Sequence, residues 1–159
     1  MLALIAALAT PLPLIPLGAW AADVPALEDG KRKINLSGRQ RMLSQRMAKA
    51  ACFAAIGVQP TEHLAQTQAA HDLFDTTLHG LRHGDADQGM NVETTPRILN
   101  EMTAVEELWT SYGAAVANAA TNADAAQAAL TRIAEMNLPV LRQMNKTVGE
   151  FERHYGGTG

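Results

Sequence analysis

Three arginines, Arg39, Arg41 and Arg46, lie within residues 34–49, a stretch that is otherwise rich in apolar and small residues. A guanidinium group is planar and always charged, and its N–H fork matches the two oxygens of a carboxylate or a small oxyanion. The chemistry that this stretch offers is therefore anion binding.

A helical projection at about 100° per residue gives the stretch two faces. The expected core stripe contains Leu36, Leu43, Met47 and Ala54. The second face lies nearly opposite, is mostly small and uncharged, and consists of Ile34, Gly38, Arg41, Gln45, Ala48 and Cys52. A glycine inside a helix costs about 0.5–1 kcal/mol relative to alanine, so Gly38 indicates the close approach of another backbone or of a ligand.

Two interpretations of the arginines follow from the pattern. An arginine that a partner desolvates on such a face requires a counter-anion, because burying it unpaired is expensive. Alternatively, Arg39, Arg41 and Arg46 extend along the bundle with their charged ends in water. Periodicity favours the solvated interpretation for Arg39 and Arg46 and leaves both open for Arg41.

Other groups that could do chemistry are poorly supported. His79 and His83 are four residues apart and could share a metal, but no third ligand accompanies them. Met42 or Met47 with His154 could ligate a haem, yet His154 adjoins a glycine-rich tail where exposure is expected. His63 and His71 are expected at the surface. With no nucleophile elbow and no phosphate loop, the sequence predicts neither an enzyme nor a cofactor.

The composition excludes some classes of protein. The chain has 159 residues, a length typical of one domain, and its net charge of −3 argues against nucleic acid as a partner. Aromatic residues make up only 4%, which favours helices over a β-sandwich. Cys52 is the single cysteine, so an intrachain disulfide is excluded, and we expect its side chain to be buried.

The first 21 residues are typical of a signal peptide. Residues 1–22 are uncharged, the run from Leu2 to Leu8 is strongly apolar, and Ala19-Trp20-Ala21 fits a small-x-small cleavage site. A basic residue before the apolar run is missing, which leaves open whether Met1 is the true start. We expect export to the periplasm and a mature domain of residues 22–159; an uncleaved membrane anchor is the alternative.

The rest of the chain predicts four helices. The first spans Asp29 to Gly57, with Asp29 as N-cap, and the second spans Pro60 to about His83. A polar loop, residues 84–89, precedes a third helix that starts at Thr95-Pro96, and Thr121-Asn122 opens a fourth. Pro139 predicts a break or kink near Asn137. Short loops between four helices indicate an all-α, antiparallel four-helix bundle.

At residues 34–49, INLSGRQRMLSQRMAK, the sequence resembles the opening motif of the PilJ-type domain, the N-terminal sensory domain of type IV pili methyl-accepting chemotaxis transducers. Weaker similarities follow in the family's order. They are Leu81-Arg82-His83-Gly84-Asp85, then Glu107-Leu108-Trp109 with Tyr112, and finally Asn137 to Leu141 with Met144-Asn145, Val148 and Phe151-Glu152.

The resemblance also implies a site. The family is related to the periplasmic domains of nitrate and nitrite sensor kinases, in which an arginine from each of two subunits grips one anion at a dimer interface. By that resemblance Arg41 matches the anion-binding arginine, and Gly38 and Met42 lie in the same box. With Ile34, Arg39 and Gln45 they form the candidate ligand-binding set. Gln45 replaces the aromatic residue expected in nitrate sensors, so nitrate specificity is not implied.

We therefore expect a free-standing periplasmic sensory bundle that binds a small anion or carboxylate, forms a homodimer and acts through a signalling or membrane protein. The alternative is a structural or adaptor bundle that binds a protein and no small molecule, which a broad exposed apolar patch would indicate.

Overall fold

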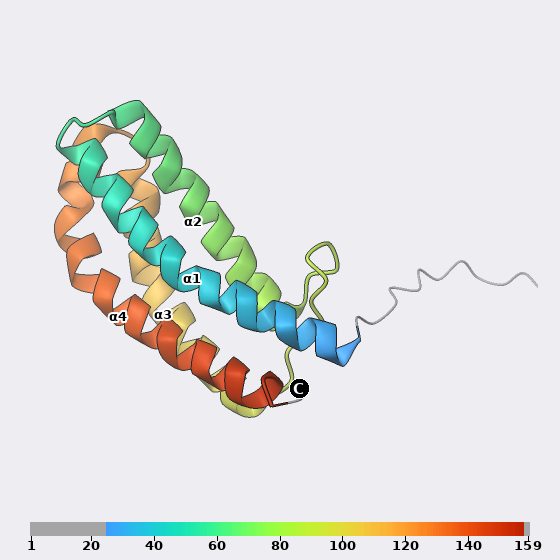
Figure 1. Ribbon diagram of the computed structural model, residues 1–159. Coiled ribbons are helices and arrows are strands. Elements are labelled where there is room, and N and C mark those ends of the chain that lie inside the picture. The colour runs from blue at the N-terminus through green and yellow to red at the C-terminus, as the bar shows by residue number, and fades with distance from the viewer. Residues whose placement is uncertain (1–24, 158–159) are drawn as a thin grey trace, which may run out of the picture.

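The computed structural model describes residues 25–157, which form four helices: α1 (Ala26–Ala55), α2 (Pro60–His83), α3 (Pro96–Ala119) and α4 (Ala123–Tyr155). Successive helices run antiparallel, and α1 packs against both α2 and α4 (Figure 1). The predicted antiparallel four-helix bundle is confirmed. In this described part of the chain no helix has the length and apolarity needed to cross a membrane. The predicted signal peptide, residues 1–21, lies outside it.

The core side of α3 is an apolar stripe at helical spacing, and all its members are buried: Ile98, Met102, Val105, Trp109, Tyr112 and Val116. The Tyr112 hydroxyl donates a hydrogen bond of 2.7 Å to the carbonyl oxygen of Ser44 on α1. Burial raises the pKa of Tyr112 well above its ordinary value, which keeps the hydroxyl a donor. The core stripe expected for the first helix is also present, with Leu43, Met47 and Ala54 buried and Leu36 packed at its edge.

Most predicted helix ends are confirmed. Thr95 and Asn122 are N-caps, and the Asn122 side chain accepts a hydrogen bond of 2.8 Å from the Ala125 backbone N–H. Gly57 follows α1 with a left-handed φ of 76°. The prediction of Asp29 as N-cap is wrong. Helix α1 begins at Ala26, and the Asp29 carboxylate is buried inside the first turn because it binds a buried lysine described below.

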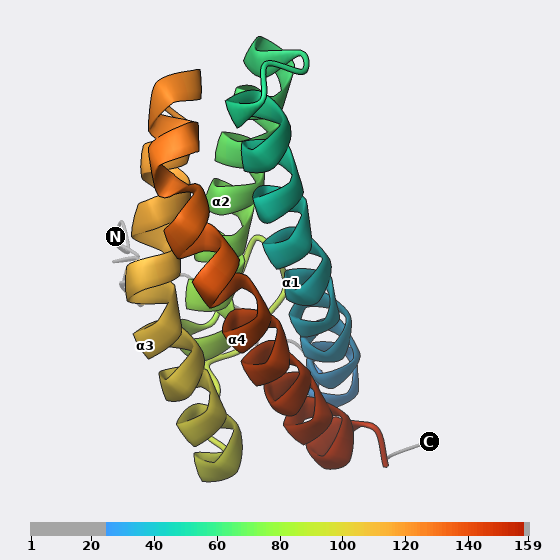
Figure 2. The ribbon, with the colours of Figure 1, turned by 90° about the vertical axis from the view of Figure 1, so that its left-hand side faces the viewer.

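Helix α4 is continuous through Pro139, so the proline kinks the helix and does not interrupt it. Proline lacks the N–H that would bond to the carbonyl four residues earlier, and its ring crowds that carbonyl. Figure 2 shows the axis of α4 changing direction part-way along its length. Packing against α1 and α3 keeps both halves helical.

Two predictions of burial are wrong. Cys52 is exposed, because it lies on the outer side of α1 while Ala50, Ala51 and Ala54 fill the core there. His63 is buried, only 8% exposed, because it packs against Phe53 across the α1–α2 turn with ring centroids 5.0 Å apart.

The connections divide between the two ends of the bundle. Figure 1 shows the start of α1, the end of α4 and the α2–α3 connection at one end, and the α1–α2 and α3–α4 turns at the other. The longer connection, residues 84–95, folds back on itself through paired hydrogen bonds of 2.8 Å between the backbones of Asp85 and Met90. This fold-back places residues 91–95 against the ends of α1 and α4.

Candidate functional site

Arg41 lies on the edge of α1 that packs against α4, and its side chain is half-buried. Its Nε donates to the carbonyl oxygen of Gly38 at 3.4 Å, and its Nη1 donates to Oδ1 of Asn145 on α4 at 3.3 Å. Both acceptors are neutral. Among residues 25–157 no carboxylate lies within ion-pair distance of Arg41. The guanidinium therefore keeps a charge that the described protein does not neutralise.

One turn further along α1, Gln45 also contacts α4. Its Nε2 donates to Oδ1 of Asn137 at 2.9 Å, and the Asn137 amide donates back to Oε1 of Gln45 at 3.2 Å. Two polar contacts, Arg41–Asn145 and Gln45–Asn137, thus hold α1 against α4 along one edge of the bundle. We refer to these four residues as the α1–α4 edge.

The remaining predicted site residues lie at different depths. Met42 is 58% exposed beside Arg41, and Ile34 is partly buried against the core. Arg39 is half-buried, and its Nε is enclosed without a hydrogen-bond partner in the described chain. Two residues correspond to about 200° around a helix, so Arg39 and Arg41 face different sides of α1. The structure groups Gly38, Arg41 and Gln45 on one edge and separates Arg39 from them.

The segments of α1 and α4 that carry the α1–α4 edge contain no acidic residue, although the net charge of the whole chain is −3. Residues 30–61 contain seven lysines and arginines and no aspartate or glutamate. The facing part of α4, residues 136–149, likewise contains no acidic residue but has Arg142 and Lys146. Neither of these two segments therefore contains an acidic side chain that could neutralise Arg41.

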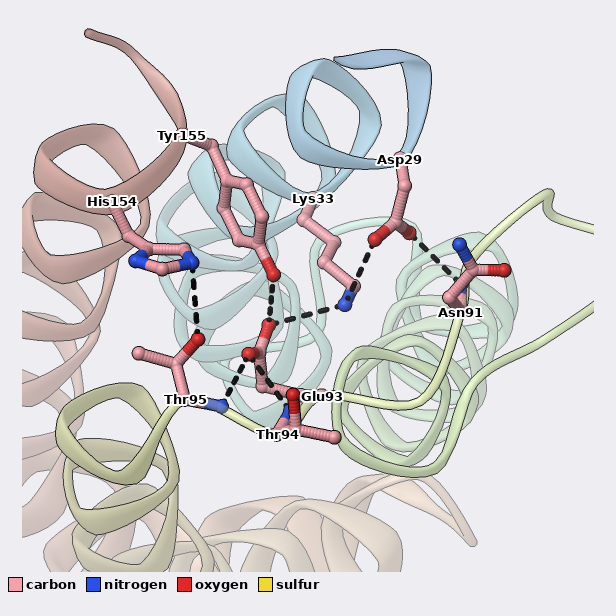
Figure 3. A network of polar contacts seen from close by, with 8 residues as sticks. All are labelled: Asp29, Lys33, Asn91, Glu93, Thr94, Thr95, His154 and Tyr155. Atoms are coloured by element: carbon pink, nitrogen blue, oxygen red, sulfur yellow. Dashed lines mark hydrogen bonds and ion pairs between the residues drawn. The ribbon is translucent and has the colours of Figure 1, made fainter. Parts of the chain in front are cut away.

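A second cation on α1, Lys33, differs from Arg41 because carboxylates of the protein surround it. Lys33 is fully buried, and its Nζ lies 3.2 Å from Oδ2 of Asp29 and 3.1 Å from Oε2 of Glu93 (Figure 3). The ring of Tyr155, near the end of α4, lies under the same ammonium at 5.5 Å. Two carboxylates and an aromatic face thus surround one buried cation. We call Asp29, Lys33, Glu93 and Tyr155 the lysine clamp.

Hydrogen bonds to the rest of the chain satisfy the carboxylates of the clamp. Oε1 of Glu93 accepts the backbone N–H groups of Thr94 and Thr95 at 3.0 and 2.9 Å, and its Oε2 accepts the hydroxyl of Tyr155 at 2.8 Å. Oδ1 of Asp29 accepts the backbone N–H of Asn91 at 2.9 Å. Because every charge in the clamp has a partner, the clamp holds the structure together and offers no free group to a ligand.

Burial of the Glu93 carboxyl works to raise its pKa, but hydrogen bonds from Thr95, Tyr155 and Lys33 outweigh it, so the pKa lies below its ordinary value. The clamp was not predicted, because the projected stretch begins at Ile34, one residue after Lys33. An acid four residues before a base, as in Asp29 and Lys33, was the available signal. The partner Glu93 lies 60 residues from Lys33 in sequence, and no local pattern identifies it.

Comparison with known proteins assigns the chain to a family. The model of the family "Type IV pili methyl-accepting chemotaxis transducer N-term" (PilJ) matches residues 26–134. The chain belongs to the PilJ family. The family prediction made from residues 34–49 is therefore confirmed. The later part of α4, with Asn137 and Asn145, lies beyond the matched residues.

Similarity to one receptor, in sequence and in structure, supports the assignment to the PilJ family. Methyl-accepting chemotaxis protein McpN of Pseudomonas aeruginosa is 29% identical over 115 residues, which is 72% of this chain and 21% of McpN. The chain thus spans about a fifth of the length of that receptor. The solved ligand-binding domain of the P. aeruginosa nitrate receptor McpN is similar with a TM-score of 0.65 and 25% identity, over 77% of this chain and 95% of that domain. The first match is a whole chemotaxis receptor and the second is its ligand-binding domain, which has a sensory and non-enzymatic role.

Removing the charge of Lys33 should strongly destabilise this PilJ domain. Lys33→Ala leaves two buried carboxylates without a cation, and we expect a loss of about 3–5 kcal/mol in the free energy of unfolding, measured by urea denaturation. Lys33→Met retains most of the apolar stem, so most of that loss should remain. Lys31→Met, at a lysine whose side chain is 59% exposed, is the control and should change stability by about 0.5 kcal/mol or less. A Lys33→Met protein as stable as wild type would contradict the clamp.

The stability contributed by Glu93 should depend on pH. Its pKa is lower in the folded than in the unfolded chain, so the contribution is complete above the ordinary value of 4.5 and is lost as the pH falls through the folded pKa. Glu93→Gln should be less stable than wild type at neutral pH, and the difference should narrow as the pH falls below about 4.5. The midpoints of urea denaturation of both proteins, measured across this pH range, give the difference in stability. A difference that is constant with pH would show that the ionised carboxylate is not the stabilising form.

Proposed function

We propose that this PilJ domain is a periplasmic sensory domain that binds a small oxyanion or carboxylate through Arg41. The observation that carries the proposal is a half-buried guanidinium held only by neutral oxygens on an edge of α1 and α4 that lacks acidic residues. A structural arginine in such a setting would be expected to have a carboxylate partner, as Lys33 has. A site that leaves its cation unneutralised is suited to receive a negative charge from outside.

A second copy of the domain would complete the site. We infer that two copies pair along the Gly38–Arg41 face of α1, where Met42 is 58% exposed. Two guanidinium groups would repel each other across that interface, and an anion between them would replace repulsion with two charge-assisted contacts. Ligand binding would then favour one arrangement of the dimer by mass action. A signalling or membrane protein partner would receive that change.

Gly38 supports such an interface. A Cβ atom at this position would meet no atom closer than Nη2 of Arg41, at 3.5 Å, so packing within the chain does not require glycine here. Gly30, on the same helix, is different because a Cβ there would lie 2.7 Å from the Tyr155 ring. An unexplained glycine beside the candidate arginine fits the close approach of a ligand or of another chain.

The charge and the planar shape of the Arg41 guanidinium indicate which ligands to test. Nitrate is the first anion to test because the McpN domain that this chain resembles is described as that of a nitrate receptor. Small carboxylates belong in the same panel, since a guanidinium fork matches their oxygens equally well. We further propose that residues 1–21 are a signal peptide and that the mature domain comprises residues 22–159.

One observation favours a second function, that of an adaptor bundle which binds only protein. Phe53, Ile56 and Val58 surround the α1–α2 turn and are 36%, 60% and 45% exposed. An exposed apolar cluster is typical of a protein interface. An adaptor of this kind would show no stabilisation by small anions.

The proposed site predicts anion-dependent stability that requires Arg41. Thermal unfolding in sodium nitrate and sodium acetate, compared with equal concentrations of chloride, should show stabilisation of wild type by at least one of them, about 2.7 kcal/mol at a hundred times Kd. Arg41→Ala should abolish this stabilisation. Arg46→Ala removes an exposed charge from the same helix and should keep it. Equal responses of Arg41→Ala and wild type would reject the site.

Gly38→Ala should separate monomer stability from anion binding. At low protein concentration and without anion, the variant should be more stable than wild type by about 0.5–1 kcal/mol, because alanine favours the helix and fits the space. Its stabilisation by anion and its anion-dependent dimerisation, measured by sedimentation, should both weaken. Gly30→Ala is the matched control and should destabilise the monomer, since its Cβ collides with Tyr155. Full anion response in Gly38→Ala would show that nothing approaches this face.

A further inference from the structure

The side-chain amide of Asn145 on α4 contacts Arg41, the candidate arginine of α1. Its Oδ1 accepts a hydrogen bond of 3.3 Å from Nη1 of Arg41, although the two residues are 104 positions apart in sequence. A neutral amide oxygen orients the guanidinium without cancelling its charge. An aspartate in the same place would form an ion pair and occupy the fork.

The contact leaves two NH2 groups available at the same place. Because Oδ1 of Asn145 faces Arg41, its Nδ2 is free to point elsewhere, and within residues 25–157 it has no hydrogen-bond partner. Nη2 of Arg41 also makes no hydrogen bond to the described residues. Two unused donors, one charged and one neutral, on groups joined by a hydrogen bond can receive two oxygens of one planar anion.

In the neighbouring amide pair on the same edge, both NH2 groups already donate hydrogen bonds within the protein. Nε2 of Gln45 and Nδ2 of Asn137 each donate to the other residue's oxygen, at 2.9 and 3.2 Å. The pair therefore fixes α4 against α1 and supports Arg41 and Asn145 from one turn away. Among the described residues, the two NH2 groups of the α1–α4 edge that make no hydrogen bond are Nη2 of Arg41 and Nδ2 of Asn145.

We propose that Asn145 is a positioning and specificity-determining residue of the anion site: it holds the Arg41 guanidinium against α4, keeps it unneutralised and supplies a second N–H donor. This inference rests on the proposed function of Arg41. It extends the site from the first-helix motif to α4, beyond the residues matched by the family model. A bound anion would then bridge α1 and α4, the two helices whose ends meet in the lysine clamp.

Asn145→Asp tests the inference because it changes charge at an exposed position. The new carboxylate should pair with Arg41, so the melting temperature in chloride should equal or exceed that of wild type. The Kd for sodium nitrate or sodium acetate, whichever stabilises wild type, should rise at least tenfold by calorimetric titration. Asn145→Ala, which removes one hydrogen-bonding group, should raise Kd roughly threefold to tenfold. Asn100→Asp, at an exposed asparagine of α3, adds the same charge elsewhere and should leave Kd unchanged.

The outcomes distinguish this inference from the proposed function. If wild type binds an anion, Arg41→Ala does not, and Asn145→Asp binds with the affinity of wild type, then the role of Asn145 is overturned and that of Arg41 stands. If neither nitrate nor acetate binds wild type, both proposals are overturned. A stable Asn145→Asp protein that has lost anion binding supports the inference, since a purely structural role would not separate the two measurements.

Discussion

The buried ammonium of Lys33 is the interaction on which the arrangement of this bundle depends. A lysine with no solvent exposure must be given counter-charges by the protein, and here they come from its own helix and from the α2–α3 connection. The ring and hydroxyl of Tyr155 add the end of α4 to the same cluster. The start of α1, the end of α4 and residues 91–95 therefore converge at one end of the molecule. That convergence fixes how α1 lies along α4.

The two cations Lys33 and Arg41 lie on the same helix, about two turns apart, and differ in one respect. Lys33 is surrounded by carboxylates that the chain provides, whereas Arg41 is held by a backbone carbonyl and an amide. Neutralised charge contributes to the folded structure, and charge left without a partner is available for an external anion. This contrast explains why one helix can serve both as a structural element and as the proposed binding element.

The similarity to the McpN ligand-binding domain fits this division of roles. The two domains have a similar fold, with a TM-score of 0.65, while only 25% of residues are identical. A bundle tolerates such divergence because its core requires apolar volume and helical spacing more than particular residues. At the proposed site, recognition would depend instead on a few polar side chains along one edge, and a small number of substitutions there would change the ligand that is bound.

The sequence by itself determined the four helices and most of their ends, because helical periodicity and capping residues act within a few positions of the chain. The family followed from the resemblance of residues 34–49 to the opening motif of the PilJ-type domain. It also singled out Arg41 and Gly38, whose spacing sets them on one side of α1. The burial of Lys33 and His63, the exposure of Cys52 and the pairing of Arg41 with Asn145 were decided only by the tertiary structure. Each of these depends on which residue of a distant helix or loop lies opposite, and that choice follows from packing of the whole bundle, which local patterns do not encode.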